Sequence, residues 1–238
     1  MVIVAMTPRS GSGYLSDLMK LNNLGQSAEH FRVSGGTMEK LVTNSKLKTY
    51  DAYVRKIIQS RSQGNIFAAK CDWPQFVPLY YFGSYDAYFR QARFVYLTRG
   101  DLLMQAISRY IGTATGYFHS TNKDKAHTLD QEVAMDFDAI TQHLTHLVNM
   151  QSAWETFFST EGISPLRLRY EELEADPVLT IRRIADFIGR PVTGDVITQT
   201  EHEKVRNERN EKLRDAYVNA ARMRRNQASQ GLLELVSK

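Results

Sequence analysis

Short apolar runs alternate with segments of helical periodicity along the chain, and this order constrains the fold more than any single motif does. The apolar runs are MVIVAM (1–6), NIFAAK (65–70), ARFVYLT (92–98) and PLRLRY (165–170). Because each run is short, apolar and bounded by polar residues, it predicts a strand of a parallel sheet buried on both faces. The segments of helical periodicity cover residues 13–22, 49–62, 101–111, 131–158 and 177–189. This alternation predicts the α/β class, with a doubly wound parallel sheet and helices on both faces.

Length and composition predict one domain in a reducing compartment. The 238 residues fit a single α/β domain over 1–238, and two small domains are the alternative division. No apolar run approaches the roughly 18 residues that a spanning helix needs. MVIVAM lacks the basic start and the cleavage site of a signal peptide. Cys71 is the sole cysteine, which excludes an intrachain disulfide and a cysteine-cluster metal site. We therefore expect a cytoplasmic protein.

A basic segment near the C-terminus, predicted to be helical over about 203–225, holds the excess positive charge. Residues 204–225 carry eight Lys or Arg against three Asp or Glu, a surplus of five, while the whole chain has a net charge of +4. Such a segment can bind nucleic acid, an acidic membrane surface or a multiply charged nucleotide. A solvated helix face explains the same charges without a partner.

The stretch RSGSGYL (9–15) follows the first predicted strand and opens the first predicted helix. Ligands of doubly wound sheets bind beyond the carboxyl ends of the strands. Small residues let the backbone approach an anion, and the N–H groups of residues 10–13 with the positive helix end form a cradle for it. Arg9 and two hydroxyl groups add donors. The alternative is a Gly/Ser turn without chemical meaning.

The loop differs from that of ATP- and GTP-binding proteins. Their pattern GxxxxGK[ST] supplies a lysine to the outer phosphates and a hydroxyl to magnesium. Here the loop ends in Gly13-Tyr14, and the strand FVYLT ends in Thr98-Arg99 where an aspartate would hold the metal. The pattern therefore predicts a phosphate bound without magnesium.

A second phosphate contact is predicted in TRGDLLMQAISRY (98–110). Arg99 ends its strand, and Ser108 lies about two helical turns beyond Asp101 on the same helix face. An anion along that helix can touch both side chains. An arginine and a serine at this spacing are common, so the prediction depends on the first loop being present as well.

Together these motifs resemble the sulfotransferases that use 3′-phosphoadenosine-5′-phosphosulfate (PAPS), and within them the bacterial trehalose 2-sulfotransferase-like family. The resemblance covers nearly the whole chain and implies a P-loop-like fold. It runs through RSGSGYL, SAEHF (27–31), AKCDW (69–73), TRGDLLMQAISRY, GYFH (116–119), YEELEADP (170–177) and ERNEKLRDAY (208–217). The family loop usually reads RSGST. Gly13 therefore keeps a backbone N–H but lacks a threonine hydroxyl, which implies weaker or abolished donor binding.

The resemblance implies roles for matched positions. The 5′ phosphosulfate would be surrounded by Arg9, Ser10, Gly11, Ser12, Gly13 and Tyr14, and the 3′ phosphate bound by Arg99 and Ser108. Glu29 matches the carboxylate that acts as general base, although a loop glutamate facing solvent is the alternative from spacing alone. Arg9 would also stabilise charge that grows on the leaving phosphate. Three further candidates are implied. Lys70 would be a cation near the sulfuryl group, Trp73 a ring for the nucleotide base or the acceptor, and Arg209 a contact to the nucleotide. The alternatives are a strand-end lysine, a core tryptophan and a solvated helix face.

We therefore predict a PAPS-dependent sulfotransferase that acts on a hydroxyl of a carbohydrate or glycolipid, releases PAP and needs no metal. A magnesium-dependent kinase with an unusual loop and a non-catalytic nucleotide-binding module are the alternatives. The expected partner is a small-molecule acceptor rather than nucleic acid, while a homodimer and a peripheral membrane contact through the basic segment stay open. Acceptor identity, the position sulfated and the oligomeric state cannot be read from the chain.

Several other sequence features say less about function. His30, His119 and His127 have no Asp or Glu at a spacing that would orient them as bases. Residues 112–130 show no periodicity, which fits a surface loop or a lid over a site. An apolar stripe at helical spacing is predicted to be core: Phe137, Ile140, Leu144, Leu147, Met150 and Trp154.

Overall fold

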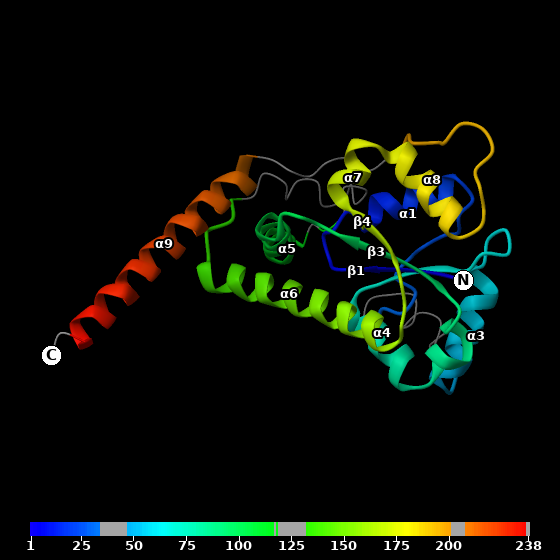
Figure 1. Ribbon diagram of the computed structural model, residues 1–238, viewed down its shortest axis with the longest axis horizontal. Coiled ribbons are helices and arrows are strands. Elements are labelled where there is room, and N and C mark those ends of the chain that lie inside the picture. The colour runs from blue at the N-terminus through cyan, green and yellow to red at the C-terminus, as the bar shows by residue number, and fades with distance from the viewer. Residues whose placement is uncertain (34–46, 117, 119–131, 201–207, 237–238) are drawn as a thin grey trace. The chain divides into compact units, whose positions relative to one another are not determined.

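The computed structural model describes residues 1–33, 47–116, 118, 132–200 and 208–236, with backbone alone for 231–236 (Figure 1). By its internal contacts the chain divides into two compact units. The first unit comprises Met1–Gly100 and Leu147–His202, and the second comprises Asp101–His146 and Glu203–Lys238.

The first unit is built on a parallel sheet of the four predicted strands. These are β1 (Val2–Met6), β2 (Ala68–Cys71), β3 (Arg93–Thr98) and β4 (Leu166–Arg169), in the order β2-β1-β3-β4. β2 starts three residues later than predicted because Asn65, with φ of 62°, lies in a turn closed by Gln63 and Ile66. Met6 pairs with Leu97 and Thr98 pairs with Arg169, so the carboxyl ends of β1, β3 and β4 share one edge.

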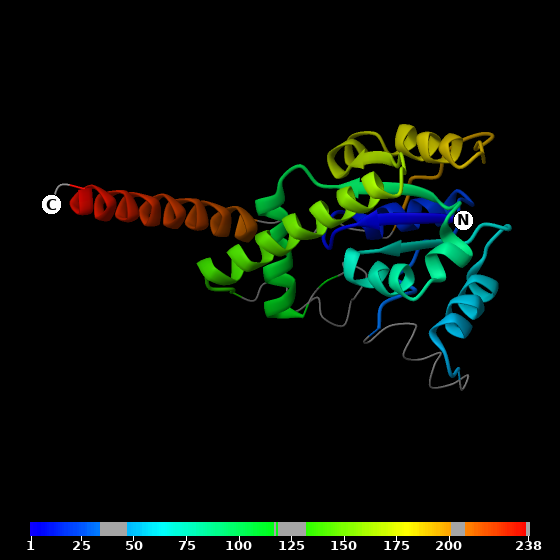
Figure 2. The same ribbon diagram turned by 60° about the horizontal axis from the view of Figure 1, so that its bottom comes forward.

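Helices cover both faces of the sheet, as the sequence predicts (Figures 1 and 2). Alternate residues of β1 point to opposite faces, because side chains in a strand have a period of two. One face packs against α1 (Ser12–Leu21), α7 (Tyr170–Ala175) and α8 (Pro177–Phe187). The other packs against α3 (Tyr50–Arg61), α4 (Trp73–Tyr81), the π-helical turn η1 (Tyr85–Phe89) and the second half of α6 (Phe137–Thr160).

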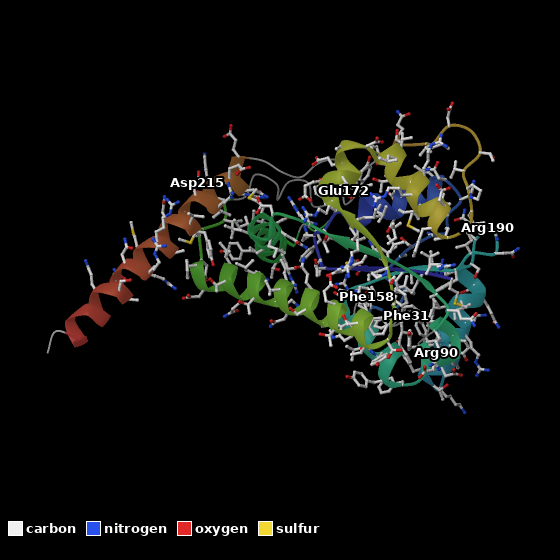
Figure 3. All side chains as sticks on the ribbon, in the orientation of Figure 1. Phe31, Arg90, Phe158, Glu172, Arg190 and Asp215 are labelled. Atoms are coloured by element: carbon white, nitrogen blue, oxygen red, sulfur yellow. The ribbon has the colours of Figure 1, made fainter. Side chains whose placement is uncertain are left out.

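The second face carries an aromatic core, in which Phe31 and Phe158 are labelled in Figure 3. Trp154 is fully buried there, and its indole N–H donates to the carbonyl of Met6 at 3.2 Å. This bond satisfies the last carbonyl of β1, immediately before the RSGSGYL loop. Trp73 packs edge-on against Trp154, with ring centroids 5.2 Å apart, which favours the core alternative for Trp73.

The second unit is helical and contains α5 (Leu102–Thr115), the first part of α6 and α9 (Glu208–Val236). α5 runs four residues beyond the predicted segment and ends where Gly116 adopts a left-handed conformation, with φ of 70°. α6 begins at residue 137 rather than 131. Of the unpatterned residues 112–130, those up to 115 are helical, and 117 and 119–130 lie outside the described residues.

α9 confirms a helix in the basic segment from residue 208 and extends it to Val236, while residues 203–207 lie outside the described part. Two residues of α9, Leu213 and Tyr217, belong to a small core with residues of α5 and α6, which are Met104, Ile107, Ile111 and Ile140. Arg224 pairs with Asp138 at 2.7 Å and lies 3.9 Å from the ring centroid of Phe137. Packing within the second unit therefore accounts for some of the residues of this basic segment without a binding partner. None of the helices in the described ranges is both long and apolar enough to cross a membrane.

Candidate active site

The loop between β1 and α1 adopts the unusual backbone that a phosphate cradle needs. Arg9 and Gly11 have φ of 67° and 82°, both left-handed, with Ser10 between them. A left-handed conformation costs a residue with a side chain about 1–3 kcal/mol, and such residues cluster at functional sites. The amide of Leu15 bonds to the carbonyl of Gly11 at 3.1 Å, so the first free N–H groups of α1 directly follow this turn.

Ser10 provides an independent sign that the loop faces a ligand. Its side chain is fully buried, and its Oγ has no hydrogen-bond partner among the described residues. A buried hydroxyl without a partner costs about 1–3 kcal/mol, so native proteins rarely leave one unsatisfied. An anion in the cradle would supply the missing partner. The remaining residues of the predicted cradle lie in the first turn of α1: Ser12 is buried, and Gly13 and Tyr14 are half-buried.

Tyr170 packs against the loop at Gly11. A Cβ on Gly11 would lie 2.2 Å from Cδ2 of Tyr170, so only glycine fits beneath this ring. Burial, followed by the proximity of Tyr170 and Glu174, raises the pKa of Tyr14 on the adjoining helix turn. The sequence contains the YEEL motif but has no local signal that its tyrosine meets Gly11, because the contact joins residues far apart in the chain.

Arg99 lies beside the same loop. Its Nη1 donates to the carbonyl of Arg9 at 3.3 Å, and its guanidinium lies 5.0 Å from the ring centroid of Tyr170. Its Nε is buried and makes no hydrogen bond within the described residues. The fold thus brings the predicted strand-end arginine to the predicted loop. Ser108 belongs to α5 in the second unit, and its role at the 3′ phosphate stays a prediction.

The sheet topology explains why the two segments meet. The chain passes from β1 outward to β2, then crosses back to β3 on the other side of β1. In doubly wound sheets ligands bind in the crevice where the strand order reverses, beyond the carboxyl ends. The RSGSGYL loop leaves the end of β1 and Arg99 leaves the end of β3. The two predicted phosphate-binding segments therefore flank this switch point.

Glu29 is held against the end of β2. Ala28 bridges to Ala69, and the amide of Lys70 bonds to the carbonyl of Ala28 at 3.0 Å. The Glu29 carboxylate accepts a hydrogen bond from Nε2 of Gln75 at 3.1 Å and lies 3.7 Å from Nζ of Lys70. Its side chain is 25% exposed and that of Lys70 only 10%. The glutamate is therefore not a solvated loop residue, because it balances a buried ammonium group.

The sequence reasoning named Lys70 as a candidate near the sulfuryl group, did not pair it with Glu29, and missed Gln75. Gln75 is buried in the first turn of α4, where its amide N–H bonds to the capping carboxylate of Asp72 at 3.0 Å. An aspartate three residues before a glutamine, after a strand, is a recognisable helix start. That signal could have placed the glutamine at the carboxyl edge of the sheet. Nη1 of Arg32 lies 3.8 Å from Oε2 of Glu29, the oxygen that also accepts from Gln75.

His30, next to Glu29, is buried rather than at the surface. Burial lowers its pKa to about 4, the backbone of Gln26 opposes this shift, and Arg61 adds to it. Its ring lies against Phe67, with centroids 5.7 Å apart, and its two nitrogens make no hydrogen bond of normal geometry among the described residues. A neutral ring in this position packs the core, so the structure offers no support for a histidine base here.

The remaining predicted residues lie either in the second unit or outside the described part of the chain. Arg209 is half-buried in α9 of the second unit, and its contact with the nucleotide stays a prediction. His119 and His127 lie outside the described residues. Within the described ranges, no three His, Cys, Asp or Glu side chains gather as metal ligands would.

Comparison with known proteins identifies the family. The sequence pattern of Stf0 sulphotransferases matches residues 83–220, which is more than half of the chain. This chain belongs to the Stf0 sulphotransferase family. The match includes Arg99, Ser108 and Tyr170, whereas the RSGSGYL loop and Glu29 precede it. The family that the motifs predicted is thereby confirmed. No curated protein matches the chain.

The solved structures that resemble the chain include two sulfotransferases. The sulfotransferase from Alicyclobacillus acidocaldarius is 18% identical, with 92% of this chain and 91% of that chain covered and a TM-score of 0.47. The sulfotransferase domain from the curacin biosynthetic pathway is 14% identical, with 89% of each chain covered and a TM-score of 0.50. At this identity, the second likeness shows the fold alone, and it agrees with a P-loop-like α/β sheet.

Proposed function

We propose that this Stf0 sulphotransferase transfers the sulfuryl group of PAPS to a hydroxyl of a carbohydrate or glycolipid. The observation that carries the proposal is the meeting of the RSGSGYL loop and Arg99 at the switch point of the sheet. PAPS carries phosphate groups at both the 3′ and the 5′ positions of its ribose, so two separate anion-binding contacts suit it. A nucleotide with phosphate on one side only would leave one of these contacts unused.

The residues present fit such a donor. The cradle of residues 9–14 would hold the 5′ phosphosulfate, where the unpartnered Oγ of Ser10 and the N-terminal amides of α1 can donate. The buried Nε of Arg99 would serve the 3′ phosphate, together with Ser108. When bound, PAPS supplies a sulfuryl group on a phosphate leaving group. Arg9 and the loop amides would stabilise the negative charge that this phosphate gains.

Glu29 is the proposed general base. It would accept the proton of the acceptor hydroxyl while the hydroxyl oxygen bonds to sulfur and the bond from sulfur to the 5′ phosphate breaks. The electron pair of that bond leaves with PAP. Gln75 and Lys70 hold two oxygens of the Glu29 carboxylate, so the base has one orientation rather than many. A positioned base typically contributes about 100- to 10,000-fold to such a step.

The predictions of localisation, metal requirement and binding partners are part of the same proposal. We infer a cytoplasmic enzyme without a metal, for which a small-molecule acceptor is the main partner. A peripheral membrane contact through the basic helix and a homodimer are open additions. A non-catalytic nucleotide-binding module is the rival, because Gly13 stands where the family loop usually has threonine.

A thermal shift with a nucleotide panel tests the donor. A ligand that binds only the folded chain stabilises it by about 2.7 kcal/mol at one hundred times its dissociation constant. We expect PAP to raise the unfolding temperature without magnesium, and AMP and ATP to raise it little. A shift that appears only with ATP and magnesium would instead support a kinase.

Glu29→Gln tests the base. The variant keeps hydrogen bonds to Gln75 but removes the negative charge, so we expect PAP binding to persist and sulfate transfer to fall about 100-fold or more. Labelled PAPS would be assayed against disaccharides and glycolipids. Glu155→Gln is the matched control, because it also removes an ion-paired carboxylate, here the partner of Arg167 at 2.6 Å. Equal transfer by parent and Glu29→Gln would assign the base elsewhere, and tight PAP binding without transfer by the parent would favour the binding module.

A further inference from the structure

The start of α7 contacts both phosphate-binding segments of the first unit. Arg169 pairs with Thr98 in the sheet, so the next two residues, Tyr170 and Glu171, lie at the edge where β3 ends. Tyr170 contacts the RSGSGYL loop, and Glu171 contacts the segment that follows β3. No motif reasoning assigned a role to these two residues.

Glu171 binds the backbone directly after Arg99. The amide N–H of Gly100 faces both carboxylate oxygens of Glu171, at 3.1 and 3.2 Å. A Cβ on Gly100 would lie 3.5 Å from Oε2 of Glu171, an ordinary van der Waals distance, so the carboxylate lies against Gly100 itself. A hydrogen bond to a charged group is stronger than one between neutral groups. Glu171 thus fixes where the chain turns at the end of β3. It thereby also fixes the backbone position from which the Arg99 side chain extends.

Tyr170 fixes the other end of the Arg99 side chain and the loop together. One part of its ring lies against Gly11, which must lack a Cβ, and the guanidinium of Arg99 lies 5.0 Å from the ring centroid. The same guanidinium donates to the carbonyl of Arg9. The ring of Tyr170 therefore packs against both the loop and the arginine.

We propose that Tyr170 and Glu171 are positioning residues that hold the loop and Arg99 at the spacing required by a nucleotide phosphorylated at both its 5′ and 3′ positions. This inference rests on the proposed function. We expect Glu171 to act on the 3′ contact alone, because its carboxylate holds the amide that directly follows Arg99. Tyr170 acts on both contacts, because its ring touches the loop and the arginine.

Ligand affinities of single variants test the division of roles. PAP is compared with 5′-AMP, which lacks the 3′ phosphate and is titrated to millimolar concentration. We expect Glu171→Ala to weaken PAP about tenfold, a loss at the lower end for a charged hydrogen bond because the contact is exposed. AMP should change less than about twofold, and Glu171→Gln, which still accepts a hydrogen bond, should restore most of the PAP affinity.

Glu172→Ala is the matched control on the same short helix (Figure 3). The Glu172 carboxylate accepts from the amide of Arg169 at 3.4 Å and pairs with Arg183 at 3.2 Å, so its loss removes a carboxylate of α7 that does not bond to Gly100. We expect it to change the affinity for PAP less than about twofold. Tyr170→Leu, which removes the aromatic ring, should weaken both ligands.

A double variant separates positioning from general destabilisation. If Glu171 acts through Arg99, Glu171→Ala should have no further effect on PAP once Arg99→Ala is present. An undiminished effect in that background, or equal losses for PAP and AMP, would overturn the inference while leaving the proposed function in place. A parent chain that binds neither nucleotide would refute the proposed function, and this inference with it.

Discussion

Replacing Gly11 by alanine tests whether the loop is built around the ring of Tyr170. The left-handed backbone of Gly11, with φ of 82°, costs an alanine about 1–2 kcal/mol. The new Cβ would also lie 2.2 Å from Cδ2 of Tyr170, where ordinary contacts are 3.4–4 Å, so the ring or the loop must move. Forced overpacking of this kind costs about 1–3 kcal/mol more, for a total of about 2–5 kcal/mol.

Gly83→Ala is the matched control, because Gly83 has nearly the same φ, 77°, and a Cβ there would meet nothing within 4 Å. Its cost should therefore be the backbone cost alone, about 1–2 kcal/mol. Thermal unfolding measures both variants, and in a protein of this size 1 kcal/mol lowers Tm by about 2–4 °C. We expect Gly11→Ala to lower Tm clearly more than Gly83→Ala and to weaken PAP binding, which Gly83→Ala leaves unchanged.

Equal losses of Tm in the two glycine variants would refute the reasoning, because the close approach of Tyr170 would then carry no free energy. A second measurement supports the assignment of the clash. In the background of Tyr170→Ala, the ring that the new Cβ would meet is absent, so Gly11→Ala should cost no more than Gly83→Ala does.

Three further outcomes follow from the structure. The pKa of His30 is about 4 in the folded chain and has its ordinary value of 6.5 in the unfolded chain, so the unfolded chain binds the proton between these values. Stability should therefore fall as pH drops from 6.5 toward 4, and His30→Leu should flatten this part of the curve of Tm against pH. Arg99→Ala and Ser108→Ala should weaken PAP far more than AMP in calorimetric titrations, with the larger loss for Arg99, whose contact is charged; equal losses for both nucleotides would end the 3′ assignment. Trp154→Phe leaves the Met6 carbonyl unsatisfied and should destabilise the chain by about 1–3 kcal/mol in urea unfolding, and an unchanged midpoint would show that the bond is dispensable.

The loop proposed to bind the 5′ phosphosulfate could be predicted from the sequence because its signal is local. Gly11 and the small residues around it lie between a strand and a helix, and both neighbours carry their own periodicity. Arg99 could be recognised for the same reason, as a charged residue at the end of an apolar run. Gln75 and Tyr170 escaped this reasoning, because each acts on a residue distant in sequence, Glu29 and Gly11 respectively.

Sequence by itself determined the four strands, most helices and the residue types at the carboxyl edge, since hydrophobic period, turn residues and strand ends are read within a few positions. Only the tertiary structure decided that Glu29 balances Lys70, that His30 is buried and uncharged, and that one aromatic ring sits between Gly11 and Arg99. These features depend on which side chains the crossover connections bring together. They also depend on which of these side chains the packed fold shields from water. Local periodicity carries neither piece of information, because charge pairing and burial are properties of the assembled sheet edge.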